Sequence, residues 1–305
     1  MKKILFLLVF SVTSLWANTS VIVVPNPPGG PPDVWGRIVA QHLTHTLNEE
    51  YIVSNRPGAD GRIAIEHVAN QPADGKTMIV ATTGSFLFSR VLQQNHKHDF
   101  NDFELLVPMV RAPVVMAVSN NLNVGNWKEF LAVAKTKSLN CAGSSSSSVF
   151  VGKQIFDHVG LRNVVFVPFR GSADMGLALA SGNIDCGFDT NYPALNFHNS
   201  NKYRIIAVGT HNRSSEVPEA MLFKDIVPGL TFYNWYGLGL LKATPADKQS
   251  KIFNTVKRLN QSADYRDKMQ RAGLEVVDTP AGSTWVQQEY IKYNSIREYL
   301  QITKE

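Results

Sequence analysis

A short apolar strand that runs straight into a loop of glycine and proline constrains the fold of this chain most. Residues 21–24 are all β-branched, the loop spans residues 25–32, and apolar residues recur at helical spacing from Val34 to Leu43. Such a junction aims backbone N–H groups and the positive end of a helix dipole at one point. The pattern predicts a strand, a turn and a helix with a candidate anion site between them. A tight chain reversal without a ligand is the alternative interpretation.

The same alternation of short apolar runs and amphipathic segments continues along the chain. Strands are predicted at residues 21–24, 51–54, 78–82, 114–118, 140–142, 164–167, 184–188, 204–208 and 237–241. Helices are expected to fill the gaps, with starts marked by Asp33, Ser148, Ser172, Thr244-Pro245 and Thr279-Pro280. This order predicts an α/β fold with mainly parallel strands.

The first 17 residues have the order of a secretory signal peptide. Lys2 and Lys3 precede an apolar run at residues 4–10, and small and polar residues lead from there to Ala17. This order predicts cleavage near Ala17. The apolar run is also shorter than the roughly 20 residues of a membrane span. A buried N-terminal helix is the alternative. Removing the two lysines lowers the formal net charge from +5 to +3, and without a dense basic run this predicts no nucleic-acid binding.

Length and cysteine content add two expectations. Without the signal about 290 residues remain, which exceeds one compact core and predicts two lobes. Cys141 and Cys186 both fall in predicted strand segments, with no spacing typical of a metal site. A disulfide is expected in an oxidising compartment. Two buried thiols that pack as small apolar side chains are the alternative.

Several motifs occur in the order found in one protein family. They are VPNPPGG at 24–30 with Asp33 and Arg37, NRPGADG at 55–61, PADGKT at 72–77, VPFRGS at 167–172, SGNID at 181–185, FD at 188–189, WYGL at 235–238 and ATP at 243–245. Together they cover essentially the whole mature chain. The chain therefore resembles the periplasmic substrate-binding proteins of tripartite tricarboxylate transporters, the TctC or Bug family.

This resemblance implies a two-lobed periplasmic binding protein fold of type II, with a mainly parallel sheet flanked by helices in each lobe. Lobe one would comprise residues 18–116 and 236–305, and lobe two residues 117–235, with crossings near 114–119 and 233–239. The implied ligand is a small organic acid: a di- or tricarboxylate, an acidic amino acid or an aromatic carboxylate. The protein would be a monomer without a cofactor or enzymatic activity, and it would serve membrane transporter subunits or, alternatively, a sensor kinase.

The resemblance also implies a ligand site on both sides of an interlobe cleft. The implied residues follow predicted strands, at the edge where ligands gather in open α/β sheets. In lobe one they are Pro28, Gly29, Gly30, Asp33, Asn55, Ala59, Gly84 and Ser85. In lobe two they are Ser145, Ser146, Ser147, Arg170, Gly171, Ser172, Asp189 and Thr190.

Four positions depart from the family pattern near this site. Pro31 and Pro32 replace small residues, and proline has no N–H to donate to an anion. Asp60 stands where glycine is usual and adds a negative charge. Arg170 replaces lysine, and a guanidinium can hold a carboxylate at two points. We therefore expect an altered ligand preference.

Two other functions fit isolated motifs. The serine run at residues 144–148 suggests an exported hydrolase, but the sequence has no G-x-S-x-G nucleophile elbow. The histidines at 42, 45, 96 and 98 suggest metal binding, but no His-Glu-x-x-His motif or cysteine pair accompanies them. Solvated loops and helix packing explain these histidines more simply.

Overall fold

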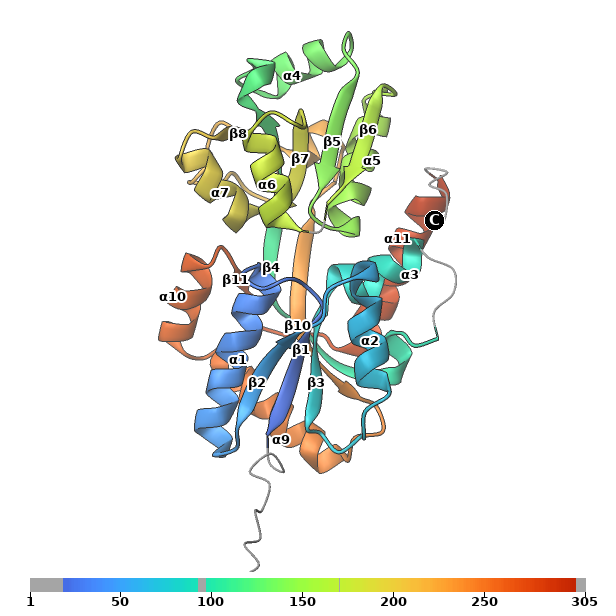
Figure 1. Cartoon of the computed structure of the whole chain (residues 1–305), viewed down its shortest axis with the longest axis vertical. Helices are drawn as coiled ribbons and strands as arrows, with labels where there is room; N and C mark the ends of the chain where they lie inside the picture. Colours follow the sequence, from blue (N-terminus) through green and yellow to red (C-terminus); the bar gives the residue numbers. More distant parts are fainter. Residues whose placement is uncertain (1–18, 93–96, 170, 300–305) are drawn as a thin grey trace, which may run out of the picture.

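The computed structural model describes residues 19–92, 97–169 and 171–299. It has two α/β lobes joined by two long strands, β4 (Phe103–Ser119) and β10 (Tyr233–Leu241) (Figure 1). Lobe one holds strands β1 (Ser20–Val24), β2 (Tyr51–Asn55), β3 (Thr77–Thr82) and β11 (Glu275–Val276), with helices α1 (Pro31–Leu47), α2 (Arg62–Ala69), α9 (Ala246–Leu259) and α10 (Ala263–Arg271). The α/β, two-lobed fold predicted from the sequence is confirmed.

Lobe two holds strands β5 (Leu139–Gly143), β6 (Val164–Pro168), β7 (Cys186–Thr190), β8 (Tyr203–Val208) and β9 (Met221–Leu222). Its helices are α4 (Trp127–Ala134), α5 (Ser146–His158), α6 (Ser172–Ala180), α7 (Asn191–Asn199) and α8 (Phe223–Ile226). The remaining elements are short helices: η2 (Ala59–Gly61), the π-helical η3 (Gly84–Phe88), α3 (Ser89–Leu92), η4 (Phe100–Asp102) and η5 (Asn120–Leu122).

The central strands of each lobe are parallel. In lobe one β1 pairs with β2 and β3 in parallel, and β10 adds to β3 in the antiparallel direction. Side chains of β1 alternate between two faces. Ile22 packs in the same core as Trp35 of α1, whereas Val23 packs in a second core with Ile65 of α2. The apolar run at 21–24 therefore becomes a strand that is covered on both faces.

Lobe two repeats this arrangement, with β5 parallel to both β6 and β7. Cys141 of β5 is paired in register with Cys186 of β7, and the two residues form a disulfide with a Cα–Cα distance of 4.5 Å. Both cysteines are fully buried. The bond therefore ties two neighbouring strands at the centre of the lobe-two sheet.

Several element boundaries differ from the sequence-based predictions. Helix α1 begins at Pro31 with Gly30 as its N-cap, so Asp33 is the third helical residue and not the cap. Helix α5 is capped by Ser145 rather than Ser148, and α6 by Gly171 rather than Ser172. The cap lies three residues earlier than predicted in α1 and α5, and one residue earlier in α6. Strand β7 likewise starts at Cys186 and extends to Thr190.

Strand β4 takes part in the sheets of both lobes. Its residues from Phe103 to Pro113 pair with β10, and those from Val114 to Ser119 pair with β7 and β8. Phe232, just before β10, accepts a hydrogen bond from the Val114 N–H at 3.1 Å. We propose on this basis that the chain crosses between the lobes at Pro113–Val114 and at Phe232–Tyr233.

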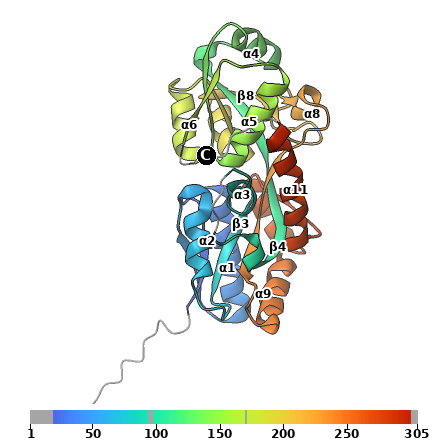
Figure 2. The same cartoon turned by 90° about the vertical axis from the view of Figure 1, so that its right-hand side faces the viewer.

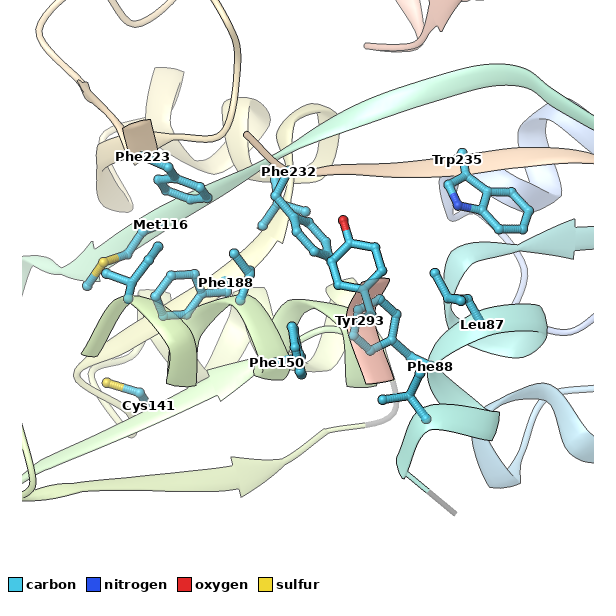
Figure 3. Close-up of a cluster of buried hydrophobic side chains, with 14 of the residues drawn as sticks. Leu87, Phe88, Met116, Cys141, Phe150, Phe188, Phe223, Phe232, Trp235 and Tyr293 are labelled. Atoms are coloured by element: carbon cyan, nitrogen blue, oxygen red, sulfur yellow. The ribbon is translucent and has the colours of Figure 1, made fainter. Parts of the chain in front are cut away.

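The C-terminal helix α11 (Ser283–Tyr299) lies beside β4 and reaches towards lobe two (Figure 2). Its Tyr293 ring meets Phe88 of η3 at 5.1 Å between centroids, Phe150 of α5 at 5.8 Å and Phe232 at 5.8 Å. Figure 3 shows these rings gathered next to the crossing strands. We call Phe88, Phe150, Phe232 and Tyr293 the hinge cluster, because they join α11 to residues of both lobes.

The predicted signal peptide lies outside the described residues. Within residues 19–92, 97–169 and 171–299, no helix has the length and apolar character needed to cross a membrane.

Candidate functional site

A cavity of about 490 Å³ lies between the two lobes. Its walls are loops at the C-terminal ends of β1, β3, β5, β6 and β7, which is where ligands bind in open α/β sheets. Strand β10 contributes Asn234 and Tyr236, both nearly buried. The remaining lining residues are Asn26, Pro27, Pro28, Gly29, Gly30, Pro31, Pro32, Thr82, Thr83, Gly84, Ser144, Ser145, Ser147, Gly171, Ser172, Ala173, Asp174, Thr190, Tyr192, Pro193, Asn196 and Phe197.

Four helices begin at this cavity: α1 from lobe one and α5, α6 and α7 from lobe two. A helix start presents unpaired N–H groups and the positive end of its dipole, both of which favour a bound anion. Among the lining residues that the structure describes, Asp174 is the only one with a formally charged side chain. An anion in this cavity would therefore be held by dipoles and hydroxyls from the described residues.

Asp33 lies behind the lobe-one wall and holds its loop in place through hydrogen bonds. One carboxylate oxygen, Oδ2, accepts hydrogen bonds from the Gly29 N–H and from Arg37 Nε, both at 2.9 Å, and Oδ1 accepts one from Asn55 Nδ2 at 2.8 Å. Burial raises the pKa of Asp33, but these hydrogen bonds outweigh it and hold the pKa below its usual value. Asp33 and Asn55 thus fix the shape of the loop, and neither lines the cavity.

The loop after β3 has its hydroxyls already engaged. Ser85 Oγ lies 2.8 Å from Thr82 Oγ1, and Thr83 Oγ1 accepts a hydrogen bond from the Trp235 N–H at 2.7 Å. Ser85 is buried behind this loop, while Gly84 faces the cavity. Ala59, in η2, is exposed and is not among the lining residues.

The serine run forms the start of α5. Ser145 caps the helix, because its hydroxyl accepts the Ser148 N–H at 3.3 Å. Ser147 donates a hydrogen bond of 2.7 Å to Asn234 Oδ1 of β10. Ser146 is not among the lining residues, although a Cβ added at Gly84 would come within 4.0 Å of its hydroxyl. The run is therefore a helix cap that also ties α5 to a crossing strand.

Asp189 lies directly behind the lobe-two wall and is 1% exposed. Its Oδ1 accepts hydrogen bonds from Ser172 Oγ at 2.6 Å and from the Thr190 N–H at 2.7 Å. Its Oδ2 has no hydrogen-bond partner in the described part of the chain. Burial raises the pKa of Asp189 to about 6, although these hydrogen bonds act in the opposite direction. The carboxyl group therefore stays protonated to a higher pH than an exposed aspartate does.

The structure brings many of the predicted ligand residues to the cavity wall: Pro28, Gly29, Gly30, Gly84, Ser145, Ser147, Gly171, Ser172 and Thr190. Asp33, Asn55, Ser85 and Asp189 lie behind the wall and support it. Arg170 lies outside the described residues, so its predicted role stays a prediction. Whether any of these groups contacts a ligand also remains a prediction.

Sequence reasoning missed the α7 part of the wall, formed by Tyr192, Pro193, Asn196 and Phe197. Their spacing is that of one helix face, and the helix follows a predicted strand. That spacing could have placed these four residues together on the cavity wall. The alternation of Asn234 and Tyr236 could have done the same for β10, because alternate residues of a strand point to the same side.

The histidines do not form a metal site in the described structure. His42 Nε2 lies 3.2 Å from the Thr255 carbonyl oxygen, and His98 Nδ1 lies 3.4 Å from Asp102 Oδ2. His96 lies outside the described residues. Within the described ranges, no group of three or more His, Cys, Asp or Glu side chains is arranged to hold a metal ion.

Comparison with known proteins places the chain in a family. The family described as "Tripartite tricarboxylate transporter family receptor" (TctC) matches residues 35–301. A UPF0065 protein of Bordetella bronchiseptica is 29% identical over 219 residues, which are 70% of this chain. The match spans 65% of that relative's length.

Two solved structures share the fold. "R. palustris Rpa4515 with adipate" is 24% identical, with a TM-score of 0.87 over 94% of this chain and 99% of that one. "MatC (Rpa3494) from Rhodopseudomonas palustris with bound malate" is 23% identical, with a TM-score of 0.83 over 92% of this chain and 99% of that one. With the family match over residues 35–301, the chain belongs to the TctC family of periplasmic solute-binding receptors, which are not enzymes.

Proposed function

We propose that this receptor captures a small organic acid in the interlobe cavity and delivers it to a tripartite tricarboxylate-type membrane transporter. The observation that carries the proposal is that the starts of α5, α6 and α7 meet at one cavity between the lobes. Backbone N–H groups at helix starts bind carboxylates without a cationic side chain. The membership of the family of transporter receptors supports the transporter as the partner, in preference to a sensor kinase.

The size of the cavity and the related structures support a carboxylate of modest size. A volume of about 490 Å³ falls in the range of small-molecule sites. Two proteins with the same fold were solved with adipate and with malate, both of which are organic acids. An acid with about as many atoms as adipate fits the available space.

The arrangement of the lobes suggests how binding is communicated. A Cβ added at Gly171 of lobe two would lie 3.9 Å from Pro27 Cγ of lobe one, so the lobes nearly touch at the rim of the cavity. We propose that a bound acid holds the lobes in this closed arrangement, with movement at the crossings of β4 and β10. The closed form of the monomer would be the shape that the transporter recognises.

A thermal-shift screen with matched acid and amide pairs tests this function. Benzoate, hexanoate and adipate would be compared with benzamide, hexanamide and adipamide on the mature chain without residues 1–17. A ligand at a hundredfold excess over its Kd stabilises the native state by about 2.7 kcal/mol, and we expect this only from acids. Equal shifts from acids and amides, or no shift from any acid, would argue against the proposal.

A variant pair locates the binding site. Thr190→Val removes a buried hydroxyl from the cavity wall with little change in volume, and we expect it to reduce the acid-induced shift. Thr136→Val is the matched control, because the Thr136 hydroxyl is exposed and bonds only to the Val133 carbonyl among the described contacts. The control should retain the full shift.

A further inference from the structure

The lobe-one wall of the cavity has lost most of the N–H groups that a helix start normally offers. Pro31 and Pro32 are the first two residues of α1, and proline has no N–H. The Asp33 N–H donates to the Gly30 carbonyl at 3.0 Å, and the Gly29 N–H is taken by the Asp33 carboxylate. Within this described turn, the Gly30 N–H is the donor that remains for a ligand.

The lobe-two wall keeps its donors. In α6, the Met175 N–H donates the first backbone hydrogen bond of the helix, to the Gly171 carbonyl at 3.3 Å. The N–H groups of the first three residues of α6 have no backbone partner among the described residues. The first two residues of α5 and of α7 are likewise free of backbone partners there. The Thr190 hydroxyl is buried, lines the cavity and has no hydrogen-bond partner among the described groups. This unpartnered group points to a polar ligand atom on the lobe-two side.

Apolar rings form another part of the wall, beside the amides of Asn26, Asn196 and Asn234. Lobe one contributes the rings of four prolines at positions 27, 28, 31 and 32, and α7 adds Tyr192, Pro193 and Phe197. Phe197 is held in place by stacking on Tyr203, with ring centroids 5.2 Å apart. A second carboxylate against the prolines would lose its hydration and find only the Gly30 N–H in the described turn, which is costly.

We infer that the preferred ligand is a monocarboxylate with an apolar chain or ring, and not a di- or tricarboxylate. This inference rests on the proposed function and names the class of acid. The carboxylate lies at the starts of α5, α6 and α7, and the apolar part packs against the prolines of lobe one. Burial of that apolar surface contributes the binding free energy that a dicarboxylate would have to gain from a second set of polar contacts.

Isothermal titration with matched acids tests the inference. Hexanoate and adipate differ only in the group at one end, as do benzoate and terephthalate. We expect hexanoate and benzoate to bind the mature chain at least about tenfold more tightly than their dicarboxylate partners, a ratio that corresponds to about 1.4 kcal/mol. Tighter binding of adipate and terephthalate would overturn the inference.

A double variant tests its physical cause. Pro31→Ala with Pro32→Ala restores two N–H groups at the start of α1 and should reduce the monocarboxylate preference at least about fivefold, mainly by strengthening adipate binding. Pro28→Ala is the control, because it also replaces a proline ring by an N–H on the same wall, but outside the helix. An unchanged preference in the double variant would overturn the inference.

Failure of the inference and of the proposed function are distinguishable. If the wild-type chain binds adipate better than hexanoate, it is still an acid receptor and only the inferred class is wrong. If it binds neither acid of either pair, the proposed function fails. Circular dichroism would show whether the double variant is folded. If it is not, the ratios of monocarboxylate to dicarboxylate affinity in the wild-type chain decide whether the inferred class of acid is right.

Discussion

Asp189 is the residue whose environment most affects how the protein responds to pH. It is buried behind Ser172 and Thr190, and only one of its carboxylate oxygens has a hydrogen-bond partner among the described groups. Burial raises its pKa to about 6, above the ordinary value of 3.8. Between these two values the native chain binds the proton and the unfolded chain does not.

The sign of the resulting pH dependence follows from this difference. Asp189 contributes stability that is fully present below pH 3.8 and is lost as the pH rises through about 6. We expect the free energy of unfolding to fall by about 1 kcal/mol from this group between pH 5 and pH 7.5. Asp189→Asn should remove this part of the pH dependence in urea denaturation.

Asp174→Asn provides the comparison, because Asp174 is exposed at the rim of the same wall. The Asp174 variant should keep the wild-type pH dependence. If the Asp189 variant and wild type lose the same free energy between the two pH values, Asp189 does not carry the raised pKa.

At the residue scale, the sequence predicted which residue types surround the site better than it predicted their roles. The Gly-Pro loop and the serine run were correctly placed at helix starts. Asp33 was expected at the ligand, and its carboxylate binds Gly29, Arg37 and Asn55 in the structure, so a contact with the ligand stays a prediction. The direction in which a short acidic side chain turns depends on neighbours that are 4 and 22 residues away. Local sequence patterns do not contain that information.

At the scale of elements, α11 is the helix that connects the two lobes outside the crossing strands. Its Tyr293 is 8% exposed and contacts the other three rings of the hinge cluster. Tyr293→Ala should lower the free energy of unfolding by about 3 to 5 kcal/mol, because truncating a buried aromatic side chain leaves a cavity. Urea denaturation measures this loss directly.

Ile291→Ala is the matched control on the same helix. Ile291 is 64% exposed, so its truncation should change the free energy of unfolding by about 0.5 kcal/mol or less. Tyr293→Phe retains the ring and should lie close to wild type. Similar losses from Tyr293→Ala and Ile291→Ala would mean that the hinge cluster does not stabilise the protein.

Most elements were predicted within a few residues, and the exceptions have physical reasons. The first half of β4 was missed because Glu104, Pro108 and Arg111 interrupt the apolar pattern, yet this part pairs with β10 over many residues. The two-residue strands β9 and β11 were also missed. Such segments become strands through their partners, so tertiary pairing overrides their local preference.

At the scale of the whole molecule, the position of the cavity followed from strand order, whereas its lining did not. The ends of β1, β3, β5, β6 and β7 meet at the cavity because strands within each lobe run in parallel. The aromatic wall of α7 depends on how lobe two faces lobe one. That relation is set by the crossing strands and α11, which pack residues from distant parts of the sequence.

The most direct test of the account is a crystal structure of the mature chain with the monocarboxylate that binds most tightly. We predict that the acid lies between the lobes, with carboxylate oxygens within about 3.2 Å of N–H groups at the starts of α5, α6 or α7. Its apolar part should contact the prolines that follow β1. An acid bound outside the interlobe cavity, or a carboxylate held only by the loop at the start of α1, would contradict the account.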